Sequence, residues 1–281
     1  MIHPTVDIHT YLKPGVRVHL AGIGGVSMCP LAEVLAGKGL LVQGSDMMES
    51  DSVKHLRSKG ISVAIGHNAE NLGDCDFVIR TAAVHDGNPE IAGAIARGIP
   101  VYERAQAWGY IMRAYKNAIC VSGTHGKTTT STLVAWLNRE VEGAGSAFLG
   151  GISKNFGSNL VLGDGPRLAV EADEYDRSFL RLRPDVAVVT AVDADHLDIY
   201  GTHEAVKEAF AQFIERIRPG GALVLKAGVD VALRNDAITV YRYAYDTPCD
   251  FYARDVRLIE GGHYRYDLVT PSGVIADCTL G

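Results

Sequence analysis

Short apolar runs alternate with amphipathic stretches over the first third of the chain. Five of these runs have the length of buried strands and lie at residues 16–23, 40–46, 61–67, 77–83 and 99–104. Stretches with helical spacing lie between them and end in glycine, at residues 27–39, 50–60 and 88–98. Strands that alternate with helices of this length are typical of βαβ units, and a glycine commonly closes a helix. The pattern therefore predicts a Rossmann-like, doubly wound parallel sheet.

The second part of the chain keeps this α/β character. Residues 105–117 predict a helix that leads into a buried strand at residues 118–124, and further strands follow at residues 167–173, 185–192 and 222–226. The helix after the first of these strands carries an apolar stripe of Leu133, Val134, Leu137 and Val141. The helix before the last strand carries an apolar face of Val206, Phe210, Phe213, Ile214 and Ile217.

The end of the chain is predicted to form three antiparallel strands. Residues 250–260, 263–270 and 273–281 are separated by turns that contain glycine or proline, which indicates a small β meander. We therefore predict an α/β fold with a Rossmann-like domain over residues 1–104 and a P-loop-type central domain over residues 105–281. Because the chain stops inside a strand, we expect it to be truncated, with a central domain that is incomplete at its C-terminus.

Composition narrows the class of protein only a little. Apolar residues make up 47% of the 281 residues and charged residues 21%, as in ordinary globular proteins. The net charge of −6 argues against non-specific binding to nucleic acids or anionic membranes. Five cysteines without C-x-x-C spacing, an N-terminus without a signal-peptide pattern and the lack of a membrane-length apolar run favour a cytoplasmic protein. No pattern specifies an oligomeric state.

A segment rich in glycine and threonine follows the strand at residues 118–124. It has the parts of a phosphate loop but is two residues shorter than G-x-x-x-x-G-K-[ST]. A helix N-terminus directs N–H groups at one point, where a lysine can neutralise phosphate and a threonine hydroxyl can reach Mg²⁺. The segment predicts a nucleoside triphosphate site, the alternative being a capping turn that happens to contain Gly-Lys-Thr. The residues predicted to bind ATP are Gly123, Thr124, His125, Gly126, Lys127, Thr128 and Thr129.

Two acidic clusters follow the next two predicted strands. The first consists of Glu171, Asp173, Glu174 and Asp176, and the second of Asp193, Asp195, His196 and Asp198. Ligands of open α/β sheets bind at the carboxyl ends of the strands, so we expect both clusters to converge on the phosphate loop. There they would offer oxygen ligands to Mg²⁺. The alternative is that these residues simply occupy solvent-facing loops.

A second glycine loop opens the first predicted domain. Gly22 and Gly24 match the first half of G-x-G-x-x-G, but Ser27 stands where the third glycine would be. Asp46 lies 22 residues after Gly24, at the end of the second strand. These features resemble a dinucleotide fingerprint and are compatible with NAD. A UDP-sugar would fit equally well, because it also brings a diphosphate to the backbone and a ribose to the acid.

Other polar residues follow the remaining strands. His67 and Thr81 would face the same crevice as Gly24, because each lies at a strand end of the first sheet. Residues 150–159 contain Lys154 and Asn155 and form either an anion- and amide-binding loop or a plain polar loop. His125 either contacts a ligand or only fills the turn.

Seven pieces of the sequence occur in the order found in the Mur ligase family. They are HLAGIGGVSM, GSD, NPE, GTHGKTTT, GGISKN, EADEYDRSF and DADHLDIYG, and together they span nearly the whole chain. The chain therefore resembles the Mur ligases, in particular those that act on UDP-N-acetylmuramate and L-alanine. In this family G-T-H-G-K-T is the ATP loop, so the resemblance accounts for the short loop.

The resemblance implies an ATP-dependent, ADP-forming amide ligase of peptidoglycan synthesis. The first domain would bind UDP-N-acetylmuramate and the central domain ATP, and an acyl phosphate of the sugar would react with the amine of L-alanine. Lys127 and His196 would be catalytic, and Mg²⁺ would be held by Thr128, Glu171 and His196. The substrate-binding residues would be Gly22, Gly24, Gly25, Ser45, Asp46, His67, Thr81, Lys154 and Asn155.

The sequence also departs from the family pattern. A C-terminal domain that helps bind the amino acid, and a histidine-asparagine pair near the adenine, find no counterpart in the 281 residues. We expect this chain to bind the UDP-sugar, to bind ATP poorly and not to form the amide at a useful rate.

Four alternatives differ in how many of these pieces they explain. A recycling ligase that adds a murein tripeptide to UDP-N-acetylmuramate shares most of the motifs, although GIGGVSM favours the alanine-adding type. Folylpolyglutamate synthetase shares the ATP loop but does not need the first domain. An NAD-dependent dehydrogenase module or a nucleotide-switch protein without chemistry would each leave one of the two nucleotide-type sites unexplained.

Overall fold

The computed structural model describes residues 6–141, 145–175 and 177–280, so Asp176 of the first acidic cluster lies outside the described residues. Contacts divide the chain into two compact units. Unit one comprises Met1–Lys116 with Thr132–Val170, and unit two comprises Asn117–Ser131 with Glu171–Gly281. The domain boundary predicted between residues 104 and 105 stays a prediction.

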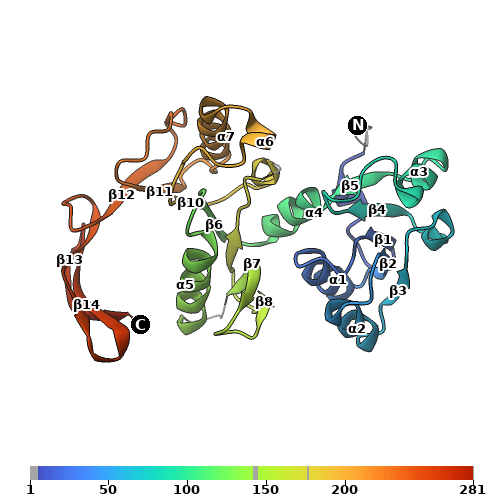
Figure 1. Ribbon diagram of the computed structural model, residues 1–281, viewed down its shortest axis with the longest axis horizontal. Helices are drawn as coiled ribbons and strands as arrows, with labels where there is room; N and C mark the ends of the chain where they lie inside the picture. The colour runs from blue at the N-terminus through green and yellow to red at the C-terminus, as the bar shows by residue number, and fades with distance from the viewer. Residues whose placement is uncertain (1–5, 142–144, 176, 281) are drawn as a thin grey trace. The chain divides into compact units, whose positions relative to one another are not determined.

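A five-stranded parallel sheet organises the first part of unit one (Figure 1). Its strand order is β3-β2-β1-β4-β5, so the order reverses at β1, as in a doubly wound sheet. The strands are β1 Arg17–Ala21, β2 Leu41–Asp46, β3 Ser62–Ile65, β4 Phe77–Arg80 and β5 Val101–Glu103. The helices are α1 Met28–Gly37, α2 Asp51–Ser58, α3 Pro89–Ala96 and α4 Arg104–Ile111. The Rossmann-like prediction is confirmed.

Local sequence signals fix the ends of these helices. At the start of α3 the Asn88 side chain accepts a hydrogen bond from the Glu90 N–H at 2.9 Å, and Pro89 occupies the first turn, where its missing N–H costs nothing. After α2 and α3 the chain turns at Gly60 and Gly98, whose φ angles of 83° and 68° favour glycine. Helices α2 and α3 therefore end close to the glycines from which their C-termini were predicted.

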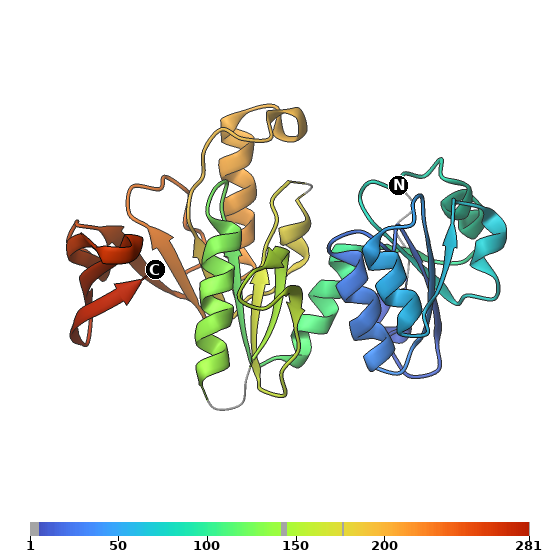
Figure 2. The same cartoon turned by 60° about the horizontal axis from the view of Figure 1, so that its bottom comes forward.

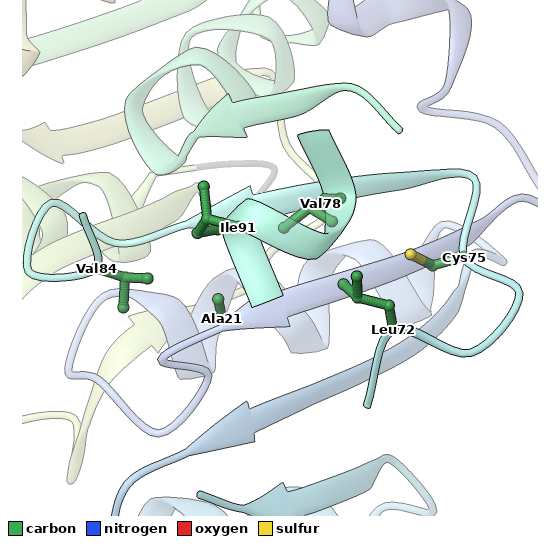
Figure 3. Close-up of a cluster of buried hydrophobic side chains, with 7 residues drawn as sticks. Ala21, Leu72, Cys75, Val78, Val84 and Ile91 are labelled. Atoms are coloured by element: carbon green, nitrogen blue, oxygen red, sulfur yellow. The ribbon is translucent and has the colours of Figure 1, made fainter. Parts of the chain in front are cut away.

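A buried apolar cluster holds α3 against the first sheet (Figure 3). Ile91 is 1% exposed and packs in one cluster with Val78 of β4, Ala21 of β1 and Leu72. Helix α3 also approaches the 3₁₀ helix η2 (Ala69–Leu72) so closely that a side chain at Gly93 would meet the Cβ of Ala69 at 2.8 Å. The start of α3 is thereby fixed beside the carboxyl ends of the strands.

Unit one also contains a hairpin that the sequence did not predict. Strand β7 (Ser146–Ser153) pairs antiparallel with β8 (Ser158–Val161) and parallel with β9 (Arg167–Glu171). Most of the stretch at residues 150–159 is therefore strand rather than loop, and only the turn between β7 and β8 keeps the expected polar character. Two adjacent glycines inside β7 weaken its strand signal in the sequence.

Helix α5 (Lys127–Glu140) does not bury the whole stripe predicted for it. Leu133, Leu137 and Val141 are 41%, 66% and 43% exposed. The packed face instead carries Ala135, which lies in a buried cluster with Ala147, Leu149 and Ala169, and Val134 covers this cluster. Small residues on this face let the helix lie close to the strands, and the larger apolar residues point elsewhere.

Unit two is built on a parallel sheet that continues into an antiparallel meander (Figure 2). Strands β6, β10, β11, β12 and β13 are paired in parallel, and β13, β14 and β15 are paired antiparallel. Their bounds are β6 Asn117–Ser122, β10 Val186–Val189, β11 Ala222–Lys226, β12 Thr239–Tyr245, β13 Phe251–Ile259, β14 His263–Thr270 and β15 Gly273–Leu280. The meander is confirmed, and β12 is an additional strand.

Helices α6 (Leu197–Tyr200) and α7 (His203–Glu215) complete unit two. The predicted apolar face of α7 is buried, and Phe213 stacks on Phe179 with ring centroids 4.9 Å apart. The helix predicted at residues 105–117 is shorter than expected. It ends at Ile111 and is followed by one 3₁₀ turn, because Asn117 already begins β6. Among the residues described, no helix combines the length and apolar character that crossing a membrane requires.

Candidate functional site

The loop between β6 and α5 depends on two glycines and one threonine. Gly123 and Gly126 have φ angles of 141° and 84°, which L-residues rarely adopt. A Cβ on Gly123 would lie 2.1 Å from Thr190 Oγ1. That hydroxyl lies within hydrogen-bond distance of two carbonyls, that of Ser122 at 3.2 Å and that of His125, and shares its one proton between them. Thr190, which directly follows β10, therefore fixes the conformation of the loop.

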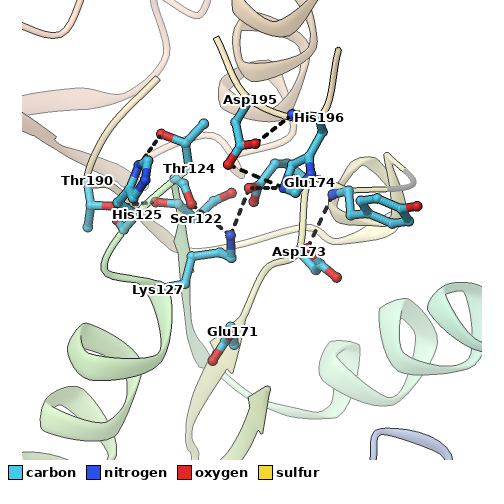
Figure 4. Close-up of polar contacts among 12 residues, drawn as sticks. Ser122, Thr124, His125, Lys127, Glu171, Asp173, Glu174, Thr190, Asp195 and His196 are labelled. Carbon is cyan, nitrogen blue, oxygen red and sulfur yellow. Dashed lines mark hydrogen bonds and ion pairs between the residues drawn. The ribbon is translucent and has the colours of Figure 1, made fainter. Parts of the chain in front are cut away.

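Lys127 folds back over the loop (Figure 4). Its Nζ donates to the Gly123 carbonyl at 2.9 Å and to Glu174 Oε1 at 2.7 Å. The two charged side chains are 16% and 1% exposed, so the pair is shielded from solvent. A buried ion pair of this kind fixes the lysine where backbone and charge meet.

Glu174 is only partly satisfied by its surroundings. Its Oε2 has no hydrogen-bond partner, and His196 Nε2 lies 3.6 Å from Oε1. Burial raises the pKa of this carboxyl, and the hydrogen bond and charge of Lys127 oppose that rise. The Tyr200 hydroxyl donates to the backbone carbonyl of Glu174 and so holds the residue in place. Lys127 is therefore the main group that opposes the rise in the pKa of Glu174.

Thr128 and Glu171 form a second pair beside the first. Thr128 Oγ1 donates to Glu171 Oε1 at 3.0 Å, and Ser131 Oγ lies 3.4 Å from Glu171 Oε2. Glu171 ends β9, and Thr128 lies in the first turn of α5. A hydroxyl oxygen and a carboxylate oxygen are thus brought to one point next to the loop.

The second acidic cluster reaches the loop through Asp193. Its Oδ2 accepts a hydrogen bond from Thr124 Oγ1 at 3.2 Å and lies 3.4 Å from His125 Nδ1. The Asp193 N–H donates to Thr124 Oγ1 at 3.1 Å. His125 and Asp193 are largely exposed, so their interaction adds little stability. The predicted convergence is therefore seen for part of each cluster: Glu171 and Glu174 of the first and Asp193 of the second contact residues of the loop or of the first turn of α5.

His196 adopts an unusual backbone conformation next to Glu174. Its φ of 53° lies in the left-handed region, and its N–H donates to Asp195 Oδ1 at 2.8 Å. The Tyr175 ring meets the imidazole edge-on at 5.1 Å. Asp173 faces away from this group, since its Oδ1 accepts from the Tyr175 N–H at 3.2 Å. The structure therefore joins His196 to Glu174 and Asp195.

The first turn of α5 presents N–H donors that the helix itself does not use. The first N–H groups of a helix have no partner within the helix, and here the intrahelical pattern starts with the Thr130 N–H, which donates to Gly126. Thr129 lies in this first turn and is exposed. N–H groups, a lysine and a threonine hydroxyl are the donors that a polyphosphate requires.

The glycine loop of the first sheet satisfies its own donors. The N–H groups of Gly22 and Ile23 both donate to the Ser45 carbonyl at 2.9 Å, and the Gly24 N–H donates to Asp46 Oδ2 at 2.8 Å. A side chain at Gly24 would lie 2.9 Å from the same Asp46 oxygen. Asp46 thus shapes the loop in this structure.

The remaining predicted substrate residues lie at the first glycine loop, in the buried polar group around Ser45, and in the turn between β7 and β8. Thr81 packs against Gly22, where an added Cβ would meet its Cγ2 at 2.7 Å. Gly25 is exposed at the tip of the loop. The side chain of Ser45 is fully buried and bound to Glu90 and His67. Lys154 and Asn155 are exposed in the turn between β7 and β8.

Two important residues, Thr190 and Glu90, were missed by sequence reasoning, and a third, Glu174, was predicted without its partner. Thr190 looked like an ordinary strand end, and its only signal was a hydroxyl at the carboxyl end of β10. Glu174 was seen as one of several acids, but nothing marked it as the partner of Lys127. Glu90 looked like a favourable acid in the first turn of a helix and is instead fully buried.

The fit of a divalent cation rests on Thr128 and Glu171. Mg²⁺ commonly takes one or two protein oxygens and completes its octahedron with phosphate and water, so this pair suits it. Within residues 6–141, 145–175 and 177–280, no group of three or more His, Cys, Asp or Glu side chains is arranged to hold a metal by itself. The structure places His196 against Glu174 rather than against this pair.

Comparison with protein families gives two matches that follow one another along the chain. The model described as Mur ligase family, catalytic domain matches residues 17–116. The model described as Mur ligase middle domain matches residues 121–278.

Individual relatives agree with these matches. The UDP-N-acetylmuramate--L-alanine ligase of Allorhizobium ampelinum is 47% identical over 200 residues, which cover 71% of this chain and 42% of the relative. The ligase of the same name from Parabacteroides distasonis is 40% identical over 272 residues, 94% of this chain and 58% of the relative. The solved UDP-N-acetylmuramate-alanine ligase MurC of Thermotoga maritima has a TM-score of 0.80 at 27% identity and covers 94% of this chain and 60% of its own. The chain spans about half the length of these curated relatives.

Proposed function

Because this chain belongs to the Mur ligase family, we propose that it acts in the ATP-dependent, ADP-forming ligation of L-alanine to UDP-N-acetylmuramate. The observation that carries the proposal is the ion pair of Lys127 and Glu174, 2.7 Å long, beside the loop that Gly123 and Thr190 hold in shape. The names of the curated relatives support the substrates. The reaction belongs to peptidoglycan synthesis.

In the first half of this reaction a carboxylate oxygen of the UDP-sugar attacks the γ-phosphorus of ATP. The bond from that phosphorus to the β,γ-bridging oxygen breaks, ADP leaves with the electron pair, and an acyl phosphate forms. Lys127 would place its charge on the transferring phosphoryl group, because its Nζ already lies at the mouth of the loop, 2.9 Å from the Gly123 carbonyl. The N–H groups at the start of α5 would orient the phosphates.

In the second half the amine nitrogen of L-alanine attacks the acyl carbon. The carbon–oxygen bond to phosphate then breaks, phosphate leaves, and the nitrogen loses a proton as the amide forms. No protein nucleophile is required, so alignment and charge neutralisation supply the catalysis. His196 lies 3.6 Å from Glu174, beside this site, and we propose that it is a catalytic residue.

Mg²⁺ would be held by Thr128, Glu171 and His196. When bound, the ion supplies positive charge against the phosphate oxygens. The 3.0 Å contact of Thr128 with Glu171 supports the first two of these ligands. The remaining residues of the loop, from Thr124 to Thr129, would line the ATP phosphates.

The first sheet would bind UDP-N-acetylmuramate. Gly22, Gly24 and Gly25 let the backbone come close to a diphosphate, and Asp46 fixes the loop through the Gly24 N–H. His67 follows β3 and Thr81 follows β4, and because both strands belong to the same parallel sheet, both residues lie at its carboxyl edge. Lys154 and Asn155, in the turn after β7, are proposed as further substrate contacts.

Calorimetric titration of the chain with UDP-N-acetylmuramate, and separately with NAD, tests the proposal. We expect saturable binding of the UDP-sugar and none of NAD. Binding of NAD alone would overturn the assignment of the first sheet and favour a dehydrogenase module. A ligation assay with the full-length protein, comparing L-alanine with a murein tripeptide, then separates the alanine-adding ligase from the recycling ligase.

A further inference from the structure

A buried polar network lies under the carboxyl ends of β1, β2 and β3, apart from the ATP loop. Its centre is Glu90, which is fully buried in the first turn of α3. Oε1 accepts a hydrogen bond from Asn71 Nδ2 at 2.7 Å, and Oε2 accepts one from Ser45 Oγ at 2.6 Å. His67 Nδ1 lies 3.0 Å from Oε2, and His19 Nε2 lies 3.2 Å from it without hydrogen-bond alignment. Both oxygens of the carboxylate are therefore occupied.

The fold holds this network rigidly. Ser45 belongs to β2, His67 follows β3, and Asn71 belongs to η2, where it also donates to the Gly66 carbonyl at 3.0 Å. The apolar cluster around Ile91 anchors α3 one residue after Glu90 (Figure 3). A carboxylate in this place also benefits from the positive end of the helix dipole.

The protons of the network can be assigned by elimination. Burial alone would raise the pKa of Glu90, but the contacts with His19, Ser45 and Asn71 together lower it to about 2, so the carboxylate is ionised and only accepts. Ser45 Oγ also lies 3.0 Å from His67 Nδ1, but its single proton is donated to Oε2 over the shorter distance of 2.6 Å, so towards Nδ1 this hydroxyl can only accept. A ring nitrogen without a proton would direct its lone pair at this anion. Nδ1 of His67 therefore carries the proton.

We infer that Glu90 is a positioning residue that fixes His67 as the Nδ1–H tautomer, so that Nε2 accepts a hydrogen bond from an N–H or O–H donor of the UDP-sugar. The inference rests on the proposed binding of that sugar to the first sheet. Nε2 has no partner among the residues the structure describes, whereas the side chain as a whole is only 9% exposed. One ring nitrogen is thus sequestered and the other is left for a ligand.

The location of His67 agrees with this role. It follows β3, the strand next to β2, whose last residue Asp46 bounds the glycine loop. In doubly wound sheets the part of a nucleotide beyond the diphosphate extends over the carboxyl ends of these two strands. The hydrogen bond made by one ring nitrogen decides what the other can do, as in carboxylate–histidine pairs of enzymes.

The tautomer can be measured in the unmodified chain. Long-range ¹H–¹⁵N spectra of the imidazoles distinguish Nδ1–H from Nε2–H, and the His67→Gln variant assigns the signal. We expect the Nδ1–H form for His67. An Nε2–H form would overturn the inference whether or not any variant folds.

The matched variants are Glu90→Gln and Glu33→Gln. Glu33 also contacts a histidine, His55, at 3.1 Å, but on the surface. We expect Glu90→Gln to remove the tautomer preference of His67 and to weaken binding of UDP-N-acetylmuramate about tenfold, and Glu33→Gln to change neither. An unchanged dissociation constant in a folded Glu90→Gln chain would also overturn the inference.

Titration with UDP in place of the whole UDP-sugar locates the donor. If Glu90→Gln weakens both ligands alike, the donor belongs to the nucleotide; if it weakens only the UDP-sugar, the donor belongs to the sugar. Failure of the unmodified chain to bind either ligand would instead refute the proposed function, while the tautomer measurement would still decide the role of Glu90.

Discussion

The two glycine loops of this protein look alike in sequence but differ in how their polar groups are used. In the loop after β1, the N–H groups of Gly22 and Gly24 are already bound by β2, and the nearby buried carboxylate of Glu90 has partners on both oxygens. In the loop after β6, Lys127 is the main partner of a buried carboxylate, Glu174, that keeps one oxygen unpaired. The donors of the first loop are thus satisfied within the protein, whereas the buried carboxylate of the second site depends mainly on the charge of Lys127.

The two buried carboxylates show what this difference means electrostatically. Burial opposes ionisation of both, yet the pKa of Glu90 is lowered to about 2 and that of Glu174 is raised. Several fixed donors outweigh desolvation at Glu90, whereas the contacts of Glu174, chiefly with Lys127, do not outweigh it there. The fixed network around Glu90 is consistent with a residue that positions His67. The incompletely satisfied pair of Glu174 and Lys127 is consistent with a lysine that also binds a ligand.

The largest expected effect is that of Lys127→Met on nucleotide binding. Loss of the charge should weaken Mg-ATP binding by about 100-fold or more, because the lysine is the principal cation at the loop. Calorimetry with ATP measures this, and UDP-N-acetylmuramate should bind as before. Lys207→Met, which breaks only an exposed pair with Asp230, is the control. Equal loss in both variants would mean that the second site does not depend on Lys127.

The next largest effect is expected from filling the second loop. Gly123→Ala places a Cβ 2.1 Å from Thr190 Oγ1 at a φ of 141°, so we expect a loss of about 3 kcal/mol in the free energy of unfolding. Gly151→Ala is the matched control, because its added Cβ meets nothing within 4 Å. Denaturant titration of both variants measures the difference. Similar stability of the two would show that the loop adapts more easily than its packing indicates.

Acid should separate the two buried carboxylates. Because the pKa of Glu90 is lowered from 4.5 to about 2, its stabilisation is complete above pH 4.5 and is lost as the pH falls toward 2. The loss should amount to about 3 kcal/mol and be absent in Glu90→Gln. Glu174 has a raised pKa, so its protonation should not destabilise the fold in the same range. Parallel pH–stability curves for the unmodified chain and Glu90→Gln would contradict this assignment.

The smallest expected effect concerns the closure of the first loop. Asp46→Asn weakens the acceptor for the Gly24 N–H, which now receives a charge-assisted hydrogen bond of 2.8 Å. We expect UDP-N-acetylmuramate to bind about tenfold more weakly, with no change for ATP. Asp74→Asn, whose side chain is 91% exposed, provides the control. A weaker affinity for ATP as well would mean that the two loops are not independent.

The regular parts of the fold could be predicted because their signals are local. The strands and helices of the first sheet follow from short apolar runs closed by Gly39, Gly60 and Gly98, all of which have positive φ. Strand β7 was missed because Gly150 and Gly151 interrupt its apolar run, and β12 because its Tyr and Arg residues do not resemble a core strand. Such strands exist because neighbours pair with them, and pairing is not visible in one sequence.

The phosphate loop of the candidate site could be predicted from the sequence, but the residues that contact the loop from other elements could not. The order of Gly123, Gly126 and Lys127 indicates a phosphate site by itself, because the chemistry resides in consecutive residues. The contacts of Thr190 with that loop join positions 65 or more residues apart. The burial of Glu90 is likewise a tertiary effect. Asn88 and Pro89 before it indicate the start of a helix, but they do not indicate that the next side chain is buried.

The left-handed backbone of His196 has a consequence for how this chain would change under selection. A histidine at a φ of 53° costs about 1 kcal/mol that glycine would not. A library selected only for folding should therefore drift to glycine at this position, and a library selected for ligation should retain the imidazole beside Glu174. Selection for stability and selection for ligation therefore favour different residues at position 196, and the residue found in each library shows which selection was applied.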